Sequence, residues 1–188
     1  MAISSRGDVA GVVRLAHGAL PVLWPSGQSA RLLPVLAGHV SGEASSVNAR
    51  GEVVGFSAQG SGKRRATAWP ASGEAIDIGT LPGGDFSQAL DINNQGDIVG
   101  ASNSSIGLRA FLWTGNGGMV DLNTLIPESD FVLTKAVGIN NAGMIMASGY
   151  ALADAHAGAA SSGADHGHDD THEMPVRVFL LVRAGGAR

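Results

Sequence analysis

The stretch "DINNQGDIVG", residues 91–100, decides how this chain is interpreted. Asp91, Asn93, Gln95 and Asp97 place oxygen-bearing side chains at alternate positions around a glycine, an order typical of a calcium-binding loop. The same order is typical of a tight turn between two strands. The two interpretations predict different proteins, because a calcium loop is a binding site whereas a turn is only a part of the architecture.

Relatives of this stretch recur along the chain. They read "AISSRGDVAG" at 2–11, "SVNARGEVVG" at 46–55 and "GINNAGMIMA" at 138–147. A branched apolar residue recurs at intervals of 44, 45 and 47 residues, at Ile3, Val47, Ile92 and Ile139. The oxygen-bearing positions change from copy to copy, whereas a glycine persists in register, at Gly7, Gly51, Gly96 and Gly143. We therefore interpret the stretch as a hairpin turn that occurs once per repeat, since glycine accepts the positive φ that such a turn needs.

Each repeat contains short apolar runs separated by turn-forming residues. In the clearest copy these runs are "ALDIN", "DIVGAS", "RAFLW" and "MVDLN", which are too short for helices. Three copies carry a tryptophan at the same position: Trp24, Trp69 and Trp113. In the fourth copy this position is Leu181. We expect the indole rings to pack between neighbouring sheets.

Four antiparallel strands in about 40–50 residues are typical of one blade of a β-propeller. The sequence thus predicts an all-β fold, a β-propeller-like array of about four four-stranded repeats. A two-layer β-sandwich is the alternative, although the fold of a sandwich does not require such a regular sequence repeat. The chain is expected to be one repeat domain, 1–188, with an insertion at 151–174 and with repeats at approximately 2–45, 46–90, 91–137 and 138–188.

The two ends of this array are expected to be unfinished. The first copy begins at its turn with little of a preceding strand, and the last copy stops after its third apolar run, "VFLLV". Unpaired strand edges invite association. We therefore expect either the C-terminal part of a larger propeller or an open array that self-associates through its edge strands.

The repeat resembles a known family. The residues "ALDINNQGDIVGAS" and "RAFLWTGNGGMVDLNTL" are similar to the repeat of the HAF-repeat family of bacterial proteins, and the resemblance extends over nearly the whole chain. It implies a propeller-like fold, an extracellular or cell-surface location and no established activity. The chain departs from the family at Arg65, Arg109 and Arg177, where histidine is frequent, and its N-terminus does not read as a signal peptide.

Composition excludes several classes of protein. Lys and Arg number 12 against 16 Asp and Glu, and the resulting net charge of −4 argues against a nucleic-acid-binding surface. The absence of cysteine excludes disulfides and thiolate metal sites. No apolar run approaches the roughly 18–20 residues that a membrane-spanning helix needs.

The insertion carries the chain's densest group of candidate metal ligands. His166, His168 and His172 lie among acidic residues, and imidazoles with carboxylates can bind Zn²⁺ or other divalent metals. The surrounding Ala, Gly and Ser residues offer little rigid support for a metal site. A solvated low-complexity loop is therefore the alternative, and no other cofactor is expected.

Three functions remain open from the sequence. We predict a non-enzymatic binding or interaction module whose partner is an unknown protein or glycan, because loops on repeat scaffolds commonly carry the partners. A glycan-active propeller enzyme is an alternative, with Asp77 and Asp121 at corresponding positions but Leu32 in the first copy. Weak divalent-metal binding through the insertion is the other. The basic stretch "GSGKRRA", 60–66, lacks the Ser or Thr of a phosphate-binding loop and is predicted to be a hairpin turn.

Overall fold

The computed structural model describes residues 1–16, 18–115, 117–127, 129–152 and 176–182. These residues form fifteen strands and one short 3-10 helix, η1 (Leu122–Thr124). The prediction of an all-β fold is therefore confirmed. The strands make four antiparallel sheets rather than the two layers of a sandwich, and each sheet is built from strands in chain order.

The sheets follow one another along the chain. The first sheet contains β1 (Ala2–Ile3), β2 (Val9–Leu15), β3 (Gly18–Trp24) and β4 (Arg31–Leu32). The second contains β5 (Ser41–Val47), β6 (Val53–Ala58), β7 (Arg64–Trp69) and β8 (Ile76–Asp77). The third contains β9 (Ser87–Ile92), β10 (Ile98–Ser104), β11 (Gly107–Thr114) and β12 (Gly118–Asp121). The fourth contains three strands within the described residues, β13 (Phe131–Ile139), β14 (Ile145–Ala151) and β15 (Arg177–Leu181).

The repeated stretch is the turn between the first and second strands of each sheet. In the third sheet the Asn93 amide donates to the Asp97 carbonyl oxygen at 3.0 Å, and the Gly96 amide donates to the Asn93 carbonyl oxygen at 3.2 Å. Gly96 has φ +91°, and its three counterparts also have positive φ. L-residues with a side chain rarely adopt this conformation, so the persistent glycine is explained and the hairpin turn is confirmed.

A second glycine serves a β-bulge inside the sheets. The pairing of β9 with β10 shifts register between Val99 and Gly100, and the bulge brings the Gln88 carbonyl close to Gly100. A Cβ on Gly100 would collide with that carbonyl oxygen and would lie 2.8 Å from the Phe111 ring. Gly55 holds the same place in the second sheet, against the Glu43 carbonyl. Glycine is thus required because two backbones approach closely at the bulge.

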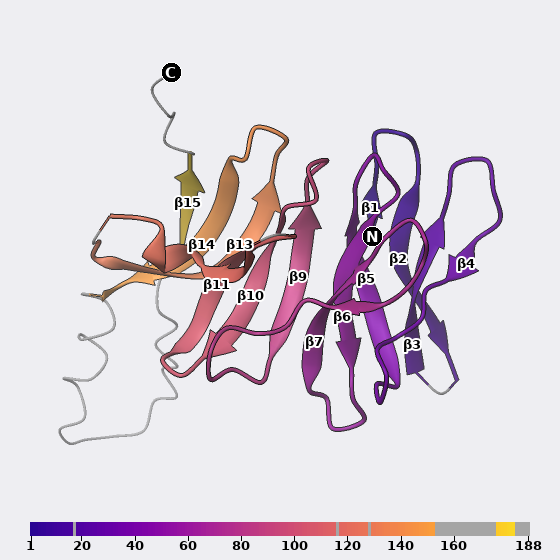
Figure 1. The fold of residues 1–188 in the computed structure, drawn as a ribbon, viewed down its shortest axis with the longest axis horizontal. Helices are drawn as coiled ribbons and strands as arrows, with labels where there is room; N and C mark the ends of the chain where they lie inside the picture. Colours follow the sequence, from indigo (N-terminus) through magenta and orange to yellow (C-terminus); the bar gives the residue numbers. More distant parts are fainter. Residues whose placement is uncertain (17, 116, 128, 153–175, 183–188) are drawn as a thin grey trace, which may run out of the picture.

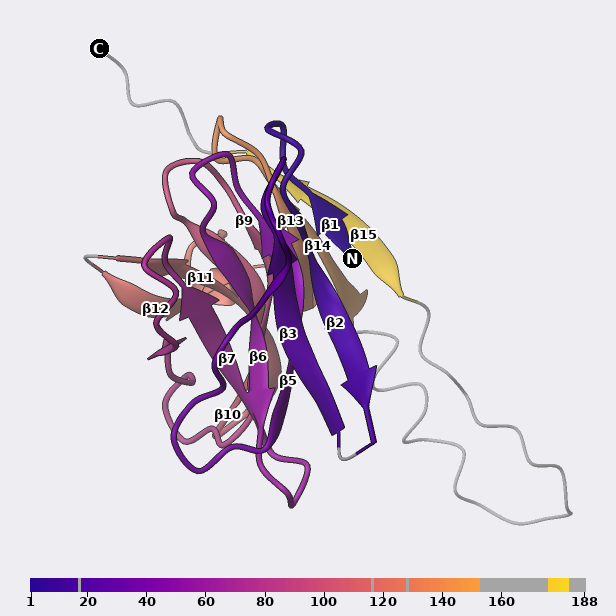
Figure 2. The ribbon, with the colours of Figure 1, turned by 90° about the vertical axis from the view of Figure 1, so that its right-hand side faces the viewer.

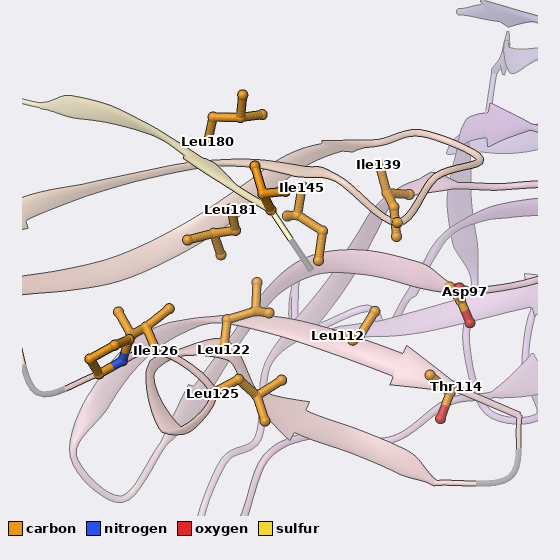
Figure 3. A pocket seen from close by; sticks show the side chains of 13 residues that line it. Asp97, Leu112, Thr114, Leu122, Leu125, Ile126, Ile139, Ile145, Leu180 and Leu181 are labelled. Carbon is orange, nitrogen blue, oxygen red and sulfur yellow. The ribbon is translucent and has the colours of Figure 1, made fainter. Parts of the chain in front are cut away.

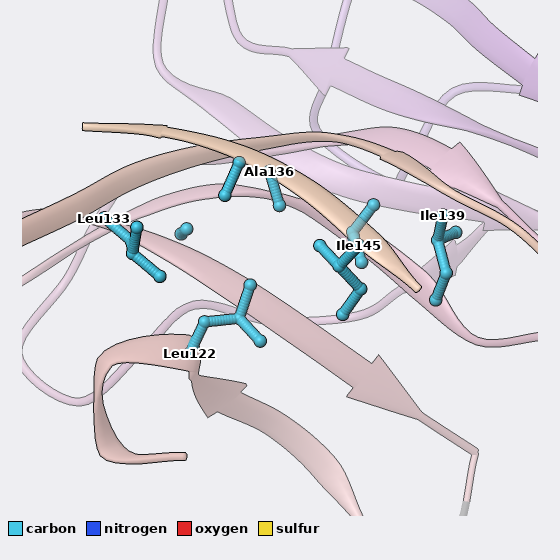
Figure 4. Packing of buried hydrophobic residues seen from close by; sticks show 8 residues of the cluster. Leu122, Leu133, Ala136, Ile139 and Ile145 are labelled. Atoms are coloured by element: carbon cyan, nitrogen blue, oxygen red, sulfur yellow. The ribbon is translucent and has the colours of Figure 1, made fainter. Parts of the chain in front are cut away.

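The four sheets stand side by side in a row, each packed on the next (Figure 1). The first strand of each sheet lies against the preceding sheet: β5 packs on β2 and β3, β9 on β6 and β7, and β13 on β10 and β11. Each of the three interfaces between sheets buries its own apolar cluster. The cluster between the third and fourth sheets includes Leu122, Leu133, Ala136, Ile139 and Ile145 (Figure 4).

Within the described residues, the row of sheets does not close on itself. The first sheet and the fourth sheet lie at its opposite ends (Figure 1), and Figure 2 looks along the row from the side of the first sheet. Each end sheet therefore has one face packed on a neighbouring sheet and one face that no other described sheet covers.

Candidate functional site

The tryptophan position distinguishes the three interfaces between sheets. Trp69 is fully buried between the first and second sheets, where its Nε1 donates to the Pro34 carbonyl oxygen at 2.7 Å. Trp113 packs on the cluster between the second and third sheets. Leu181 has this position between the third and fourth sheets and packs on their cluster. A leucine side chain is shorter and narrower than an indole, so the third interface is filled less completely at this point.

A large cavity lies at the third interface. It has a volume of about 590 Å³, within the range typical of small-molecule sites. Its walls come from the turn before β10, from β11, from η1 and the residues after it, from the ends of β13 and β14 with the turn between them, and from β15 (Figure 3). Most of the residues that line it are aliphatic: Leu112, Leu122, Leu125, Ile126, Ile139, Ile145, Leu180 and Leu181. Leu180 borders the cavity, but its side chain points to the opposite face of β15 from that of Leu181 (Figure 3).

The second interface carries a smaller version of the same cavity. That cavity measures about 110 Å³ and is lined by residues that correspond, one repeat earlier, to much of the larger lining. Glu52 corresponds to Asp97, Ile92 corresponds to Ile139, and Trp113 corresponds to Leu181. The larger cavity therefore differs from the smaller one in two respects. It has Leu181 in place of a tryptophan, and it has an additional wall formed by Leu125 and the residues after it.

The polar groups of the large cavity gather at one end. Figure 3 places Asp97 and Thr114 away from Leu125 and Ile126. One oxygen of Asp97 accepts a hydrogen bond from the Asn93 side-chain amide at 3.0 Å. The Thr114 hydroxyl oxygen accepts one from the Gly117 amide at 3.2 Å. The cavity can thus shelter an apolar group while two oxygen-bearing side chains mark one end.

Three of the four side chains that suggested a calcium loop, those of Asp91, Asn93 and Asp97, accept hydrogen bonds from the protein. Asp91 accepts from the Ser46 hydroxyl at 2.6 Å and from the Ile139 amide at 2.8 Å, so one carboxylate joins the second, third and fourth sheets. Asn93 accepts through its side chain from the amides of Gln95 and Asp97, both at 2.9 Å. These oxygens hold the turn and its neighbours together.

Further hydrogen bonds link the turns of successive sheets. The Asn48 side-chain amide donates to the Asn93 carbonyl oxygen at 2.9 Å, and the Ala49 amide donates to the Asn94 side chain at 2.9 Å. The Asn94 amide donates in turn to the Asn141 side chain at 2.9 Å. We refer to these bonds as the turn ladder. They give the asparagines of the repeat a role between sheets that the sequence alone did not indicate.

The two acidic residues of the glycan-enzyme alternative form ion pairs within their own sheets. Asp77 pairs with Arg65 at 3.1 Å and also accepts from the Gly79 amide at 2.8 Å. Asp121 pairs with Arg109 at 3.7 Å and accepts from the Asn123 amide at 2.9 Å. In both sheets the carboxylate therefore fixes the turn that follows the fourth strand and neutralises an arginine.

Basic residues of the stretch at 60–66 also contact other residues of the chain. Lys63 pairs with Asp85 at 2.9 Å, and the Arg64 guanidinium lies 4.3 Å from the centre of the Phe56 ring. The hydrogen bond from Lys63, followed by the one from Asn103, lowers the pKa of Asp85 below its ordinary value. These contacts fit a hairpin turn rather than a phosphate-binding loop.

The predicted metal ligands His166, His168 and His172 lie outside the residues that the structure describes. Across the described ranges, no three His, Asp or Glu side chains are grouped so as to hold a metal ion. In the same residues, no helix is long and apolar enough to cross a membrane. Metal binding by the insertion thus stays a prediction.

No protein-family model, no curated protein and no solved structure matches this chain. The resemblance to HAF-repeat proteins therefore stays a prediction from the repeat residues. The signal for the large cavity was nevertheless present in the sequence, since Leu181 replaces a tryptophan that the other copies retain. Its volume depends on the packing of η1 and β15, which no spacing of residues reveals.

Proposed function

We propose that the four sheets are successive blades of a β-propeller-like array. Support comes from the order of the strands, which runs without crossovers in every sheet. The first strands also contact one another from sheet to sheet, β1 with β5, β5 with β9, and β9 with β13. First strands that converge in this way are expected where blades surround a common axis.

We further propose that the chain is a non-enzymatic binding module, and that the large cavity beside Leu181 takes an apolar group of its ligand. The observation that carries this proposal is the difference between two corresponding cavities, about 590 Å³ beside Leu181 and about 110 Å³ beside Trp113. An aliphatic cavity with a few polar groups at one end favours a ligand with a ring or chain and a polar end. The ligand can be a small molecule or an apolar side chain of a protein partner.

Other parts of the proposal rest on the sequence. An extracellular or cell-surface location follows from the resemblance to HAF-repeat proteins. The glycan-active alternative gains no support from Asp77 and Asp121, because each carboxylate is occupied by an arginine and a turn amide. Binding of a divalent metal by the insertion is a separate proposal, tested by titration with Zn²⁺.

A substitution at the tryptophan position tests the binding proposal. The Leu181→Trp variant restores the residue that the other copies carry and should fill much of the cavity. With the probe 1-anilinonaphthalene-8-sulfonate, which has apolar rings and a polar end, we expect binding to weaken by roughly tenfold, which corresponds to about 1.4 kcal/mol. Fluorescence titration measures the affinity.

The matched control is Leu108→Trp, which adds an indole to an exposed position of β11 that does not line the cavity. This variant should bind the probe as the unaltered chain does. If Leu181→Trp and Leu108→Trp bind the probe equally well, the cavity is not the binding site and the proposal is wrong.

A further inference from the structure

The three interfaces between sheets use one pair of faces three times. We call the face that each sheet turns to the next sheet its trailing face, and the face turned to the preceding sheet its leading face. On the trailing faces, Val54 of the second sheet and Val99 of the third are completely buried. On the leading faces, Val47, Ile92 and Ile139 are buried. Each interface thus joins one trailing face to one leading face.

The trailing face of the fourth sheet has the same apolar character, but no other described sheet covers it. Met146 corresponds to Val54 and Val99, and it is 46% exposed. Its cross-strand neighbour Leu180 is 65% exposed, and Val178, which corresponds to the buried Ala66 and Ala110, is 71% exposed. These apolar side chains occupy the positions that pack on a following sheet elsewhere in the molecule.

The leading face of the first sheet is open in the corresponding way. Ile3 holds the position of Val47, Ile92 and Ile139, and it is 71% exposed where they are buried. Trp24 occupies the position of the fully buried Trp69 but is only partly buried. The molecule therefore presents, at opposite ends of the row, the two halves of the interface that it forms three times internally.

We propose that a second copy of this chain covers these faces, with the trailing face of one fourth sheet packed on the leading face of the other copy's first sheet. This contact repeats the packing of the three internal interfaces, so its occupant is a sheet of the same repeat. It is head-to-tail, because two different faces meet. Such contacts close into a ring or continue as a filament, depending on the rotation between copies. This inference uses the faces of the end sheets, whereas the sequence predicted association through strand edges.

The geometry can be tested with two variants that each disable one face. Val178→Asp places a carboxylate on the trailing face, outside the large cavity, and Ile3→Asp places one on the leading face. Both residues are exposed, so both variants should remain folded, which their melting curves check. The matched control is Ile106→Asp, since Ile106 is an equally exposed aliphatic residue in the turn between β10 and β11.

Sedimentation should show the unaltered chain and the control as a dimer or larger multiples of the 19.0 kDa chain. Each face variant alone should sediment as a monomer. An equimolar mixture of the two should regain a dimer, because one intact trailing face then meets one intact leading face.

Three results would overturn the proposal. The first is an unaltered chain that stays monomeric over the whole concentration series, as expected if another molecule or another part of the same chain covers the faces. The second is assembly by the Ile3→Asp variant alone, which would mean that like faces meet. The third is a mixture that stays monomeric. Binding of the fluorescent probe in the large cavity should be unchanged in both face variants. The binding proposal and the assembly proposal can therefore fail separately, and the two measurements tell these failures apart.

Discussion

At the scale of single residues, Asp91 shows how one side chain can serve three repeats. Its two oxygens accept from Ser46 of the second sheet and from the Ile139 amide at the end of β13 in the fourth sheet. The residue is half-buried, so both bonds are partly shielded from water. Hydrogen bonds to a charged group contribute about 1.5–3 kcal/mol each, and an unpaired buried donor is costly.

Asp91→Ala should therefore lower the free energy of unfolding by about 2–3 kcal/mol, since both donors lose their acceptor. Asp91→Asn should cost less, because its side-chain oxygen can still accept from one donor. Urea denaturation measures both variants, with Asp130→Ala at an exposed position as the control. A loss no larger than that of the control would show that Asp91 does not join the sheets.

At the scale of one strand pair, the bulge at Gly100 determines the register in which β9 pairs with β10. The sequence shows glycine at this place in three copies, Gly11, Gly55 and Gly100, but not the reason for it. The reason is the carbonyl of Gln88, which occupies the space of a Cβ. Because β9 also carries the contacts with the second sheet, a change in the bulge would be transmitted to the interface.

Gly100→Ala should destabilise the chain by about 2–3 kcal/mol, as overpacking against backbone commonly does. Gly60→Ala is the matched control, because a Cβ there meets no atom within 4 Å and the position has no positive φ. Thermal unfolding followed by circular dichroism compares the two. Equal melting temperatures would mean that the bulge can relax without cost.

At the scale of the whole molecule, the row of sheets predicts a gradient of stability. Among the described residues, the second and third sheets have neighbours on both faces, whereas each end sheet has one neighbour. The turn ladder ties the third sheet to the second and to the fourth. When repeats contact only their neighbours, stability is approximately a sum of repeat and interface terms. We expect amides of β6 and β10 to exchange with deuterium more slowly than those of β2 and β14 at matched intrinsic rates.

Hydrogen exchange with mass spectrometry measures this order. Two results would contradict it: uniform protection in all four sheets, or slower exchange in the fourth sheet than in the third. If copies assemble through the end sheets, protection of β2 and β14 should rise with protein concentration while β6 and β10 change little.

The repeat was enough to predict an all-β chain, because turn glycines and short apolar runs are local signals. The turn at Gly96 was predicted correctly, since its φ depends on only a few residues. The site was not predicted. The cavity depends on how Leu181, η1 and Ile145 meet across two sheets, and such distances are set by tertiary packing rather than by residue spacing. The candidate metal residues lie in the insertion, outside the described residues, and stay untested.

The tryptophan position also has a spectroscopic consequence. The chain has three tryptophans and one tyrosine, and these chromophores fall in different sheets: Trp24 in the first, Trp69 in the second, Trp113 in the third and Tyr150 in the fourth. Fluorescence excited at wavelengths longer than the tyrosine absorption band therefore comes from the first three sheets, and the fourth sheet contributes no fluorophore to it. Variants that retain a single indole would make each of these three sheets separately visible, and energy transfer from Tyr150 would report how closely the fourth remains docked.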